Sequence, residues 1–171
     1  MEEYRKEFKK YNLIVGQGLA ECGDFDSRKK MQNLKQTYKE FIKRKAVFIF
    51  NENDTMSVEE IKFGDNDILS AYLFCELKFD VLINKITYNG LLRNGKIIEV
   101  ADSYDKTDYD NIKDEIKESR GGLEGKLKSM KIVNQSNGIG IISNYRFSIL
   151  DILKGNKQRT IFLPNLLKNR E

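Results

Sequence analysis

Residues 51–67 carry the densest group of side chains that could bind a small polar ligand. The segment reads NENDTMSVEEIKFGDND and contains six carboxylates and three asparagines. Asparagine amides bind both amino and carboxylate groups, and carboxylates bind an ammonium. The segment joins the apolar runs 46–50 and 68–75. Polar loops between a strand and a helix are common ligand sites in α/β proteins, so we expect a binding loop here.

The same segment also has a purely structural interpretation. Asn53 and Asp54 are typical turn residues, and Asp67 is well placed as the N-cap of a helix over 68–78. In this interpretation the loop is solvated and binds nothing. The residues by themselves leave both interpretations open, and the Asp67 cap is expected under either.

The rest of the chain alternates between helical and strand patterns. Apolar residues recur at helical intervals in some segments, whereas short β-branched and aromatic runs are typical of buried parallel strands. The expected strands are 13–19, 46–50, 80–83, 96–100 (a hairpin arm), 138–143 and 159–164, and the expected helices are 2–11, 28–44, 68–78, 147–153 and one that follows 119–126 and ends near 135. This alternation predicts an α/β fold, a three-layer αβα sandwich with a mainly parallel sheet, as one unit over 1–171.

Composition excludes several classes of function. Histidine is absent, which removes Ser-His-Asp and Cys-His catalytic systems and most zinc sites, and no metal-ligating residues are predicted. Lys and Arg total 30 against 26 Asp and Glu, and the +4 surplus is spread along the chain, so we expect no nucleic-acid partner. Cys22 and Cys75 are interpreted as reduced thiols of a cytoplasmic protein. No apolar run approaches the ~20 residues that span a bilayer, so no membrane partner is expected.

Five segments in order resemble the glutamate 5-kinases, which belong to the amino acid kinase family. NEND at 51–54 with GDND at 64–67 is the most specific pair. The other similar segments are CGDFDSRKKMQN (22–33), FDVLINKITYNGLL (79–92), SRGGLEGKLKSMKI (119–132) and GIGIISNYRFSILDILKGNKQRTIFLP (138–164). The resemblance implies an ATP-dependent transfer of the γ-phosphoryl group to the side-chain carboxylate of glutamate, in proline synthesis, with Mg²⁺.

The resemblance also implies roles for residues on the glutamate side. Asp54, Asp65 and Asn66 would bind glutamate. Asp67 would organise the catalytic lysines from the start of its helix. Phosphoryl transfer depends chiefly on positioning and charge neutralisation, so lysines, magnesium and helix N-termini are the expected parts.

On the nucleotide side, the resemblance implies a strand end and a glycine-rich loop. The implied residues are Thr87, Gly121, Gly122 and Lys126, with Lys126 on the transferred phosphoryl group. This side departs from the family pattern at several positions. Ile86 and Thr87 stand where the family has Thr-Asp, Asn89 stands for the aspartate of the turn, and Ser119, Arg120 and Gly125 replace residues of the glycine-rich loop.

The family also uses an early lysine-bearing phosphate loop, and no VKxGS-like stretch occurs in these 171 residues. We therefore expect a single partial amino acid kinase domain, impaired or inactive alone, that forms a homo-oligomer or is completed by an N-terminal chain. The alternative is a non-catalytic or regulatory module that binds glutamate or proline, because proline inhibits this family at the glutamate site. A basic structural or nucleic-acid protein is a third interpretation, which only the net charge supports.

Overall fold

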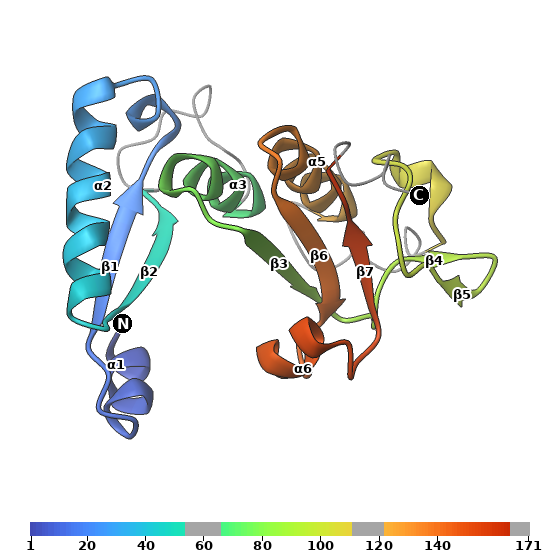
Figure 1. The fold of residues 1–171 in the computed structure, drawn as a ribbon, viewed down its shortest axis with the longest axis horizontal. Helices are drawn as coiled ribbons and strands as arrows, with labels where there is room; N and C mark the ends of the chain where they lie inside the picture. Colours follow the sequence, from blue (N-terminus) through green and yellow to red (C-terminus); the bar gives the residue numbers. More distant parts are fainter. Residues whose placement is uncertain (54–65, 111–121, 165–171) are drawn as a thin grey trace. The chain divides into compact units, whose positions relative to one another are not determined.

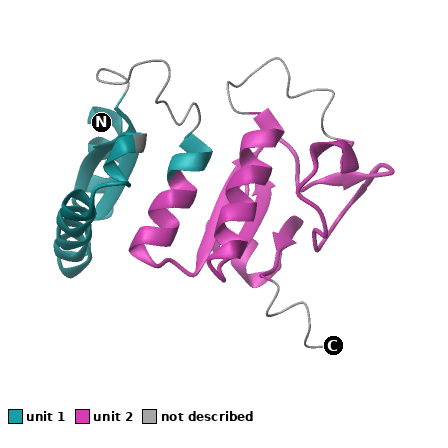
Figure 2. Ribbon diagram, turned by 90° about the horizontal axis from the view of Figure 1, so that it is seen from above, with its two compact units in different colours: residues 1–69 teal, residues 70–171 magenta. Residues whose placement is uncertain are grey.

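The computed structural model of the protein describes residues 1–53, 66–110 and 122–164 (Figure 1). The chain forms two compact units, which we call unit 1 (residues 1–69) and unit 2 (residues 70–171) (Figure 2). The boundary falls inside a helix, α3 (Asn66–Leu77), after its fourth residue. Helices and strands alternate along both units, as the sequence predicts.

Unit 1 is built on two parallel strands and a long helix. Its elements are α1 (Glu2–Lys9), β1 (Val15–Ala20), the 3₁₀ turn η1 (Cys22–Asp24), α2 (Arg28–Lys43), β2 (Val47–Glu52) and the start of α3. Strands β1 and β2 pair in parallel, with Val15 opposite Val47 and Ala20 opposite Glu52. The helix between them is the crossover that a parallel pair requires.

Aromatic packing joins α2 to the strand pair. Phe41 of α2 stacks on Phe48 of β2 with ring centroids 4.2 Å apart. The ring of Phe41 also lies directly over Gly16 of β1, where an added Cβ would come within 2.2 Å of the ring. A larger residue at this position would push the helix off the strand. Helix α2 begins where the sequence predicts, because the Ser27 hydroxyl accepts a hydrogen bond from the Lys30 amide at 3.4 Å.

Unit 2 is built on a three-stranded sheet. Its elements are the rest of α3, β3 (Val81–Ile86), β4 (Leu92–Arg93), β5 (Lys96–Ile97), the 3₁₀ turn η3 (Lys106–Asp108), α5 (Gly122–Gln135), β6 (Ile139–Asn144), α6 (Ile149–Lys154) and β7 (Arg159–Phe162). The sheet order is β3-β6-β7. Strands β3 and β6 are parallel, whereas β7 runs antiparallel to β6.

The core of unit 2 lies between this sheet and α5. Leu127 and Met130 on α5 are at most 1% exposed, and they share a buried cluster with Ile142 of β6 and Phe162 of β7. Val133, further along α5, is buried in a second cluster with Ala71 and Phe74 of α3. Full burial of one such side chain stabilises a fold by about 1.5–3 kcal/mol. The apolar positions of α5 therefore fix the helix against the sheet and hold its first turn in a defined place.

Two expectations differ from the structure in detail. The predicted arm 96–100 forms a short hairpin between β4 and β5, and Val100 instead makes a parallel bridge with Ile161. The predicted N-cap Asp67 is wrong, because α3 already includes Asn66 and Asp67 lies in its first turn. An acidic side chain is favourable there as well, since it faces the positive end of the helix dipole.

Candidate active site

The described part of the predicted glutamate side lies where β2 ends and α3 begins. The Asn66 side chain connects these two elements within unit 1. Its Oδ1 accepts a hydrogen bond from the Glu52 amide at 3.3 Å, and its Nδ2 donates to Asn51 Oδ1 at 2.9 Å. Both ends of the segment that carries the NEND and GDND motifs are therefore joined by one amide group.

Asn66 keeps capacity to bind a ligand. An amide side chain offers two donor hydrogens and two acceptor lone pairs. The two bonds to Asn51 and Glu52 use one donor and one acceptor. Asn66 is exposed. Among the contacts of the described residues, one donor and one acceptor of this amide are not used, and a polar ligand such as an amino acid could engage them.

The acidic residues of this side are only partly within the described residues. Asp67 is half-buried in the first turn of α3, where an acidic side chain is favourable at the positive end of the helix dipole. Asp54 and Asp65, which the sequence predicts to bind glutamate, lie outside the described residues. Their roles stay predictions.

On the β1 side of this region, Asp24 organises the turn that leads into α2. Its Oδ2 accepts a hydrogen bond from the Glu21 amide at 2.9 Å, and its Oδ1 pairs with Lys30 Nζ at 2.6 Å. The hydrogen bond from Lys30 to Asp24 raises the pKa of the Lys30 ammonium above its ordinary value. This pair is exposed to solvent on the lysine side, so it fixes the turn more than it stabilises the fold.

The nucleotide side of the predicted site belongs to unit 2. Thr87 follows the last residue of β3, and Asn144 ends the neighbouring parallel strand β6. Asn144 Nδ2 donates to the Thr87 carbonyl at 2.7 Å and to Asn89 Oδ1 at 3.1 Å. The carboxyl edge of a parallel sheet is where α/β proteins bind ligands. The strand ends at this edge are joined by amide side chains, as at the end of β2.

The glycine-rich segment leads into the N-terminus of α5. This helix returns the chain to the start of β6, so it runs opposite to β3 and β6 and begins at their carboxyl edge. Gly122, its first residue, has φ +47°, a conformation that favours glycine. Lys126 follows one turn later and is half-buried. Gly121 lies outside the described residues.

Charges near the start of α5 are already paired in part. Glu124 forms ion pairs with Lys106 at 2.7 Å and Lys128 at 3.0 Å. The hydrogen bonds from these two lysines lower the pKa of the Glu124 carboxyl to about 2. The ammonium groups of Lys106 and Lys128 are therefore both in ion pairs with Glu124. Lys126 is the lysine that the sequence resemblance assigns to the phosphoryl group.

The structure therefore distributes the predicted site residues between the units. Asn66 and Asp67 lie in unit 1, and Thr87, Gly122 and Lys126 lie in unit 2. Sequence reasoning missed one type of residue, the asparagine at a strand end. Asn51 and Asn144 lie in the last two residues of β2 and β6, and the available signal was an amide at the polar end of an otherwise apolar strand run.

No group of three Cys, Asp or Glu side chains in the described ranges is arranged to hold a metal ion. No helix of the described chain is both long and apolar enough to span a bilayer.

Comparison with known proteins identifies the relatives of this chain. The amino acid kinase family model matches residues 1–142. The chain is 33% identical to glutamate 5-kinase of Clostridium acetobutylicum over 175 residues, which is 96% of this chain and 65% of that protein. The chain spans about half the length of several other glutamate 5-kinases at 32–34% identity. The resemblance to glutamate 5-kinases is thereby confirmed.

Solved structures show the same fold at low sequence identity. UMP kinase from Ureaplasma parvum matches with a TM-score of 0.59 and 14% identity, over 94% of this chain and 64% of that one. Carbamate kinase from Giardia lamblia bound to AMP-PNP matches with a TM-score of 0.57 and 12% identity, over 94% and 70%. The predicted α/β class with a mainly parallel sheet is confirmed. Because the family model covers most of its residues and its fold agrees, this chain belongs to the amino acid kinase family.

Proposed function

We propose that this chain provides the glutamate-binding side and part of the nucleotide-binding side of a glutamate 5-kinase. The reaction is transfer of the γ-phosphoryl group of ATP to the side-chain carboxylate of glutamate, the first step of proline synthesis. The chain covers 65% of the Clostridium acetobutylicum enzyme, so substrate binding is the activity we assign to these residues, and catalysis by the chain alone is expected to be weak. Units 1 and 2 would then be parts of one partial kinase domain.

The observation that carries this proposal is the Asn66 bridge. One amide joins the NEND end of β2 to the GDND start of α3, and its bonds to described residues use only one donor and one acceptor. Asp54 and Asp65 would bind the ammonium group of glutamate from the segment between these motifs, and Asp67 would orient lysines at the start of α3. Glutamate is the substrate of the relatives by name, and this polar site suits its charged ends.

The start of α5 fits the phosphate groups of a nucleotide. Gly122 adopts φ +47° at a helix N-terminus, where backbone amides point outward and favour an anion. Lys126 lies one turn further and would contact the transferred phosphoryl group. When bound, ATP supplies the γ-phosphoryl group, and Mg²⁺ would neutralise charge on its phosphates. Thr87, Gly121 and Gly122 would position the nucleotide, and Lys126 would stabilise negative charge as it develops.

A second candidate function is a non-catalytic module that binds glutamate or proline. One observation favours it. The Thr87 carbonyl at the carboxyl edge of β3 accepts a hydrogen bond from Asn144, so one of its two lone pairs is already used on the nucleotide side. In either case we propose a cytoplasmic protein with small-molecule ligands that acts as a homo-oligomer or together with a complementing N-terminal chain.

Ligand binding to the purified chain tests the two functions. We expect L-glutamate to raise the midpoint of thermal unfolding in a saturable manner, whereas L-glutamine, which lacks the side-chain carboxylate, has a smaller effect. No saturable shift with glutamate or proline would contradict both functions.

Nucleotide binding then separates the kinase from the module. For the kinase, a fluorescent ATP analogue binds saturably, and Lys126→Gln weakens this binding by about tenfold or more, the typical loss of one charge-assisted contact to phosphate. Lys131→Gln is the matched control, since Lys131 lies on the exposed surface of the same helix. Glutamate binding without any nucleotide binding would support the module and exclude the kinase.

A further inference from the structure

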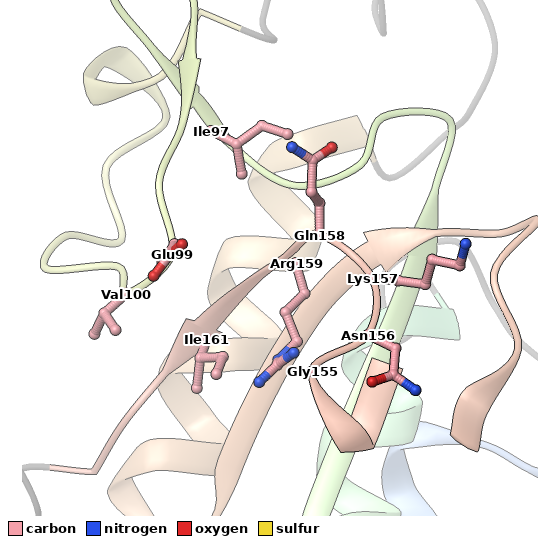
Figure 3. Close-up of a pocket in the computed structure, with 9 residues that line it drawn as sticks. All are labelled: Ile97, Glu99, Val100, Gly155, Asn156, Lys157, Gln158, Arg159 and Ile161. Atoms are coloured by element: carbon pink, nitrogen blue, oxygen red, sulfur yellow. The ribbon is translucent and has the colours of Figure 1, made fainter. Parts of the chain in front are cut away.

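Unit 2 contains a pocket of about 470 Å³ that the proposed kinase function does not use. Its walls come from two segments, the end of the β4–β5 hairpin and the connection from α6 into β7 (Figure 3). Ile97, Val100 and Ile161 supply apolar surface, and Glu99 and Arg159 supply opposite charges. None of Thr87, Gly122 and Lys126 lines this pocket.

Arg159 faces the pocket because of the alternation of β7. Thr160 and Phe162 are buried in the core at 0% and 1% exposure, so Arg159 and Ile161 point to the other side of the strand. Figure 3 shows the guanidinium group extending from the strand toward Gly155. An added Cβ at Gly155 would lie 3.1 Å from Nη1 and 3.3 Å from Nη2 of Arg159, so a glycine leaves room for this group.

The charge of Arg159 is not neutralised within the described residues. Its Nε is buried and has no hydrogen-bond partner there, and no ion pair within 4.0 Å involves its guanidinium. Most buried polar groups in proteins have a partner, and leaving one unpaired costs about 1–3 kcal/mol. Packing therefore holds the guanidinium in place, and its terminal nitrogens are available to an anion from the pocket.

The other charged groups of the pocket restrict which anion fits. Lys157 also lines the pocket, and its ammonium keeps its positive charge while lying over the Phe147 ring at 5.5 Å. Glu99 is exposed at the rim and forms no ion pair with Arg159. Its negative charge repels a dianion more strongly than a monoanion. The planar fork of arginine matches a carboxylate with two parallel hydrogen bonds.

We propose that this pocket binds the carboxylate of a small monoanionic molecule, with Arg159 as its anchor and the apolar wall of Ile97, Val100 and Ile161 against the rest of the ligand. The site is separate from the proposed kinase site. A hydrogen bond links the two sites, in which Asn89 Nδ2 donates to Gln158 Oε1 at 2.9 Å.

Amide NMR spectra of the full chain, titrated with sodium acetate against sodium chloride at equal ionic strength, test this proposal. We expect saturable shifts at Glu99, Val100 and the 155–161 segment. Arg159→Gln should weaken acetate binding by about tenfold or more, because a charge-assisted bidentate contact is lost. Glu99→Gln should strengthen it a few-fold. Lys154→Gln is the matched control, since it removes the same charge nearby but does not line the pocket.

Several outcomes would overturn the proposal. Shifts that grow linearly, or that are the same in Arg159→Gln, would show that acetate does not bind at this arginine. Tighter binding of inorganic phosphate than of acetate would contradict the assigned class of anion. If Arg159→Gln does not fold, the exposed Glu99→Gln variant still tests the proposal. Acetate binding to Glu99→Gln that is unchanged or weaker than in the wild type would contradict the proposed charge arrangement. Lys126→Gln should leave acetate binding unchanged, so failure of the kinase function and failure of this site are distinguishable.

Discussion

Replacement of Asn66 by alanine tests the central feature of the glutamate side. The variant removes the acceptor for the Glu52 amide and the donor to Asn51 Oδ1. If Asn66 also contacts glutamate, the variant loses that contact as well. Two effects are therefore expected from one change, a lower stability of unit 1 and a weaker affinity for glutamate.

The size of each effect follows from the contacts. The two hydrogen bonds are exposed, and a typical hydrogen bond contributes about 0.5–1.5 kcal/mol, so Asn66→Ala should lower the free energy of unfolding by about 1–3 kcal/mol. A hydrogen bond from Asn66 to a charged group of glutamate contributes about 1.5–3 kcal/mol. Its loss corresponds to roughly a 10–150-fold increase in Kd.

Asn51→Ala is the matched control because it separates contact from positioning. It removes the bond between Asn51 Oδ1 and Asn66 Nδ2 but leaves the Asn66 side chain and its bond to Glu52. Urea unfolding gives the stability of both variants, and calorimetric titration gives the glutamate affinity. We expect Asn51→Ala to lose about half as much stability and to keep glutamate affinity within a few-fold. Equal loss of affinity in both variants would refute a direct contact from Asn66.

Two further predictions concern buried polar groups of unit 2. Burial, followed by the nearby Asp102 charge, raises the pKa of Tyr109 to about 12, above its ordinary value near 10. The neutral phenol therefore contributes stability that is complete below about pH 10 and is lost between about pH 10 and 12. Urea unfolding across this range should show a steeper decline for the wild type than for Tyr109→Phe, and parallel curves would contradict the shift. Asn134→Leu should destabilise the chain by about 3 kcal/mol or more, because it leaves the Gly138 and Phe162 carbonyls unpaired, whereas a loss below about 1 kcal/mol would contradict this network.

Much of the fold could be predicted from sequence because its signals are local. The Ser27 cap, the apolar spacing of α2 and α5, and the β-branched runs of β2 and β6 each depend on residues within one element. The observed bounds differ from the predicted ones by a few residues. The start of α3 was predicted two residues too late, at 68 instead of Asn66, because several polar residues before the apolar run are good helix-start residues and the sequence does not rank them.

The direction of a strand relative to its neighbour, and the hydrogen bonds between residues far apart in the sequence, could not be predicted in the same way. The run at 159–164 has a strand pattern, but such a pattern is the same for a parallel and an antiparallel neighbour, and β7 is antiparallel. The bond from Asn66 to Asn51 spans 15 residues, and the bond from Asn144 to Thr87 spans 57. Asn144 and Thr87 are adjacent because the register of β3 and β6 brings the two strand ends together, and Asn66 and Asn51 are adjacent because α3 begins beside the end of β2. No local pattern encodes either contact.

Asparagine at these edges has a consequence for binding. The Asn66 and Asn144 amides both donate and accept hydrogen bonds, so they join neighbouring chain ends without adding charge. An aspartate in either position could not donate to its partner, and it would add a negative charge where substrate carboxylates and phosphates are expected to bind. Within unit 2, a neutral amide at Asn144 thus leaves the potential at this edge to Lys126 and the N-terminus of α5, which favour anions. Asn144→Asp should therefore weaken nucleotide binding more than Asn144→Ala does, although the aspartate is closer in shape to the native residue. The same fluorescent ATP analogue measures this order, and the reverse order would show that the amide acts only as a structural bridge.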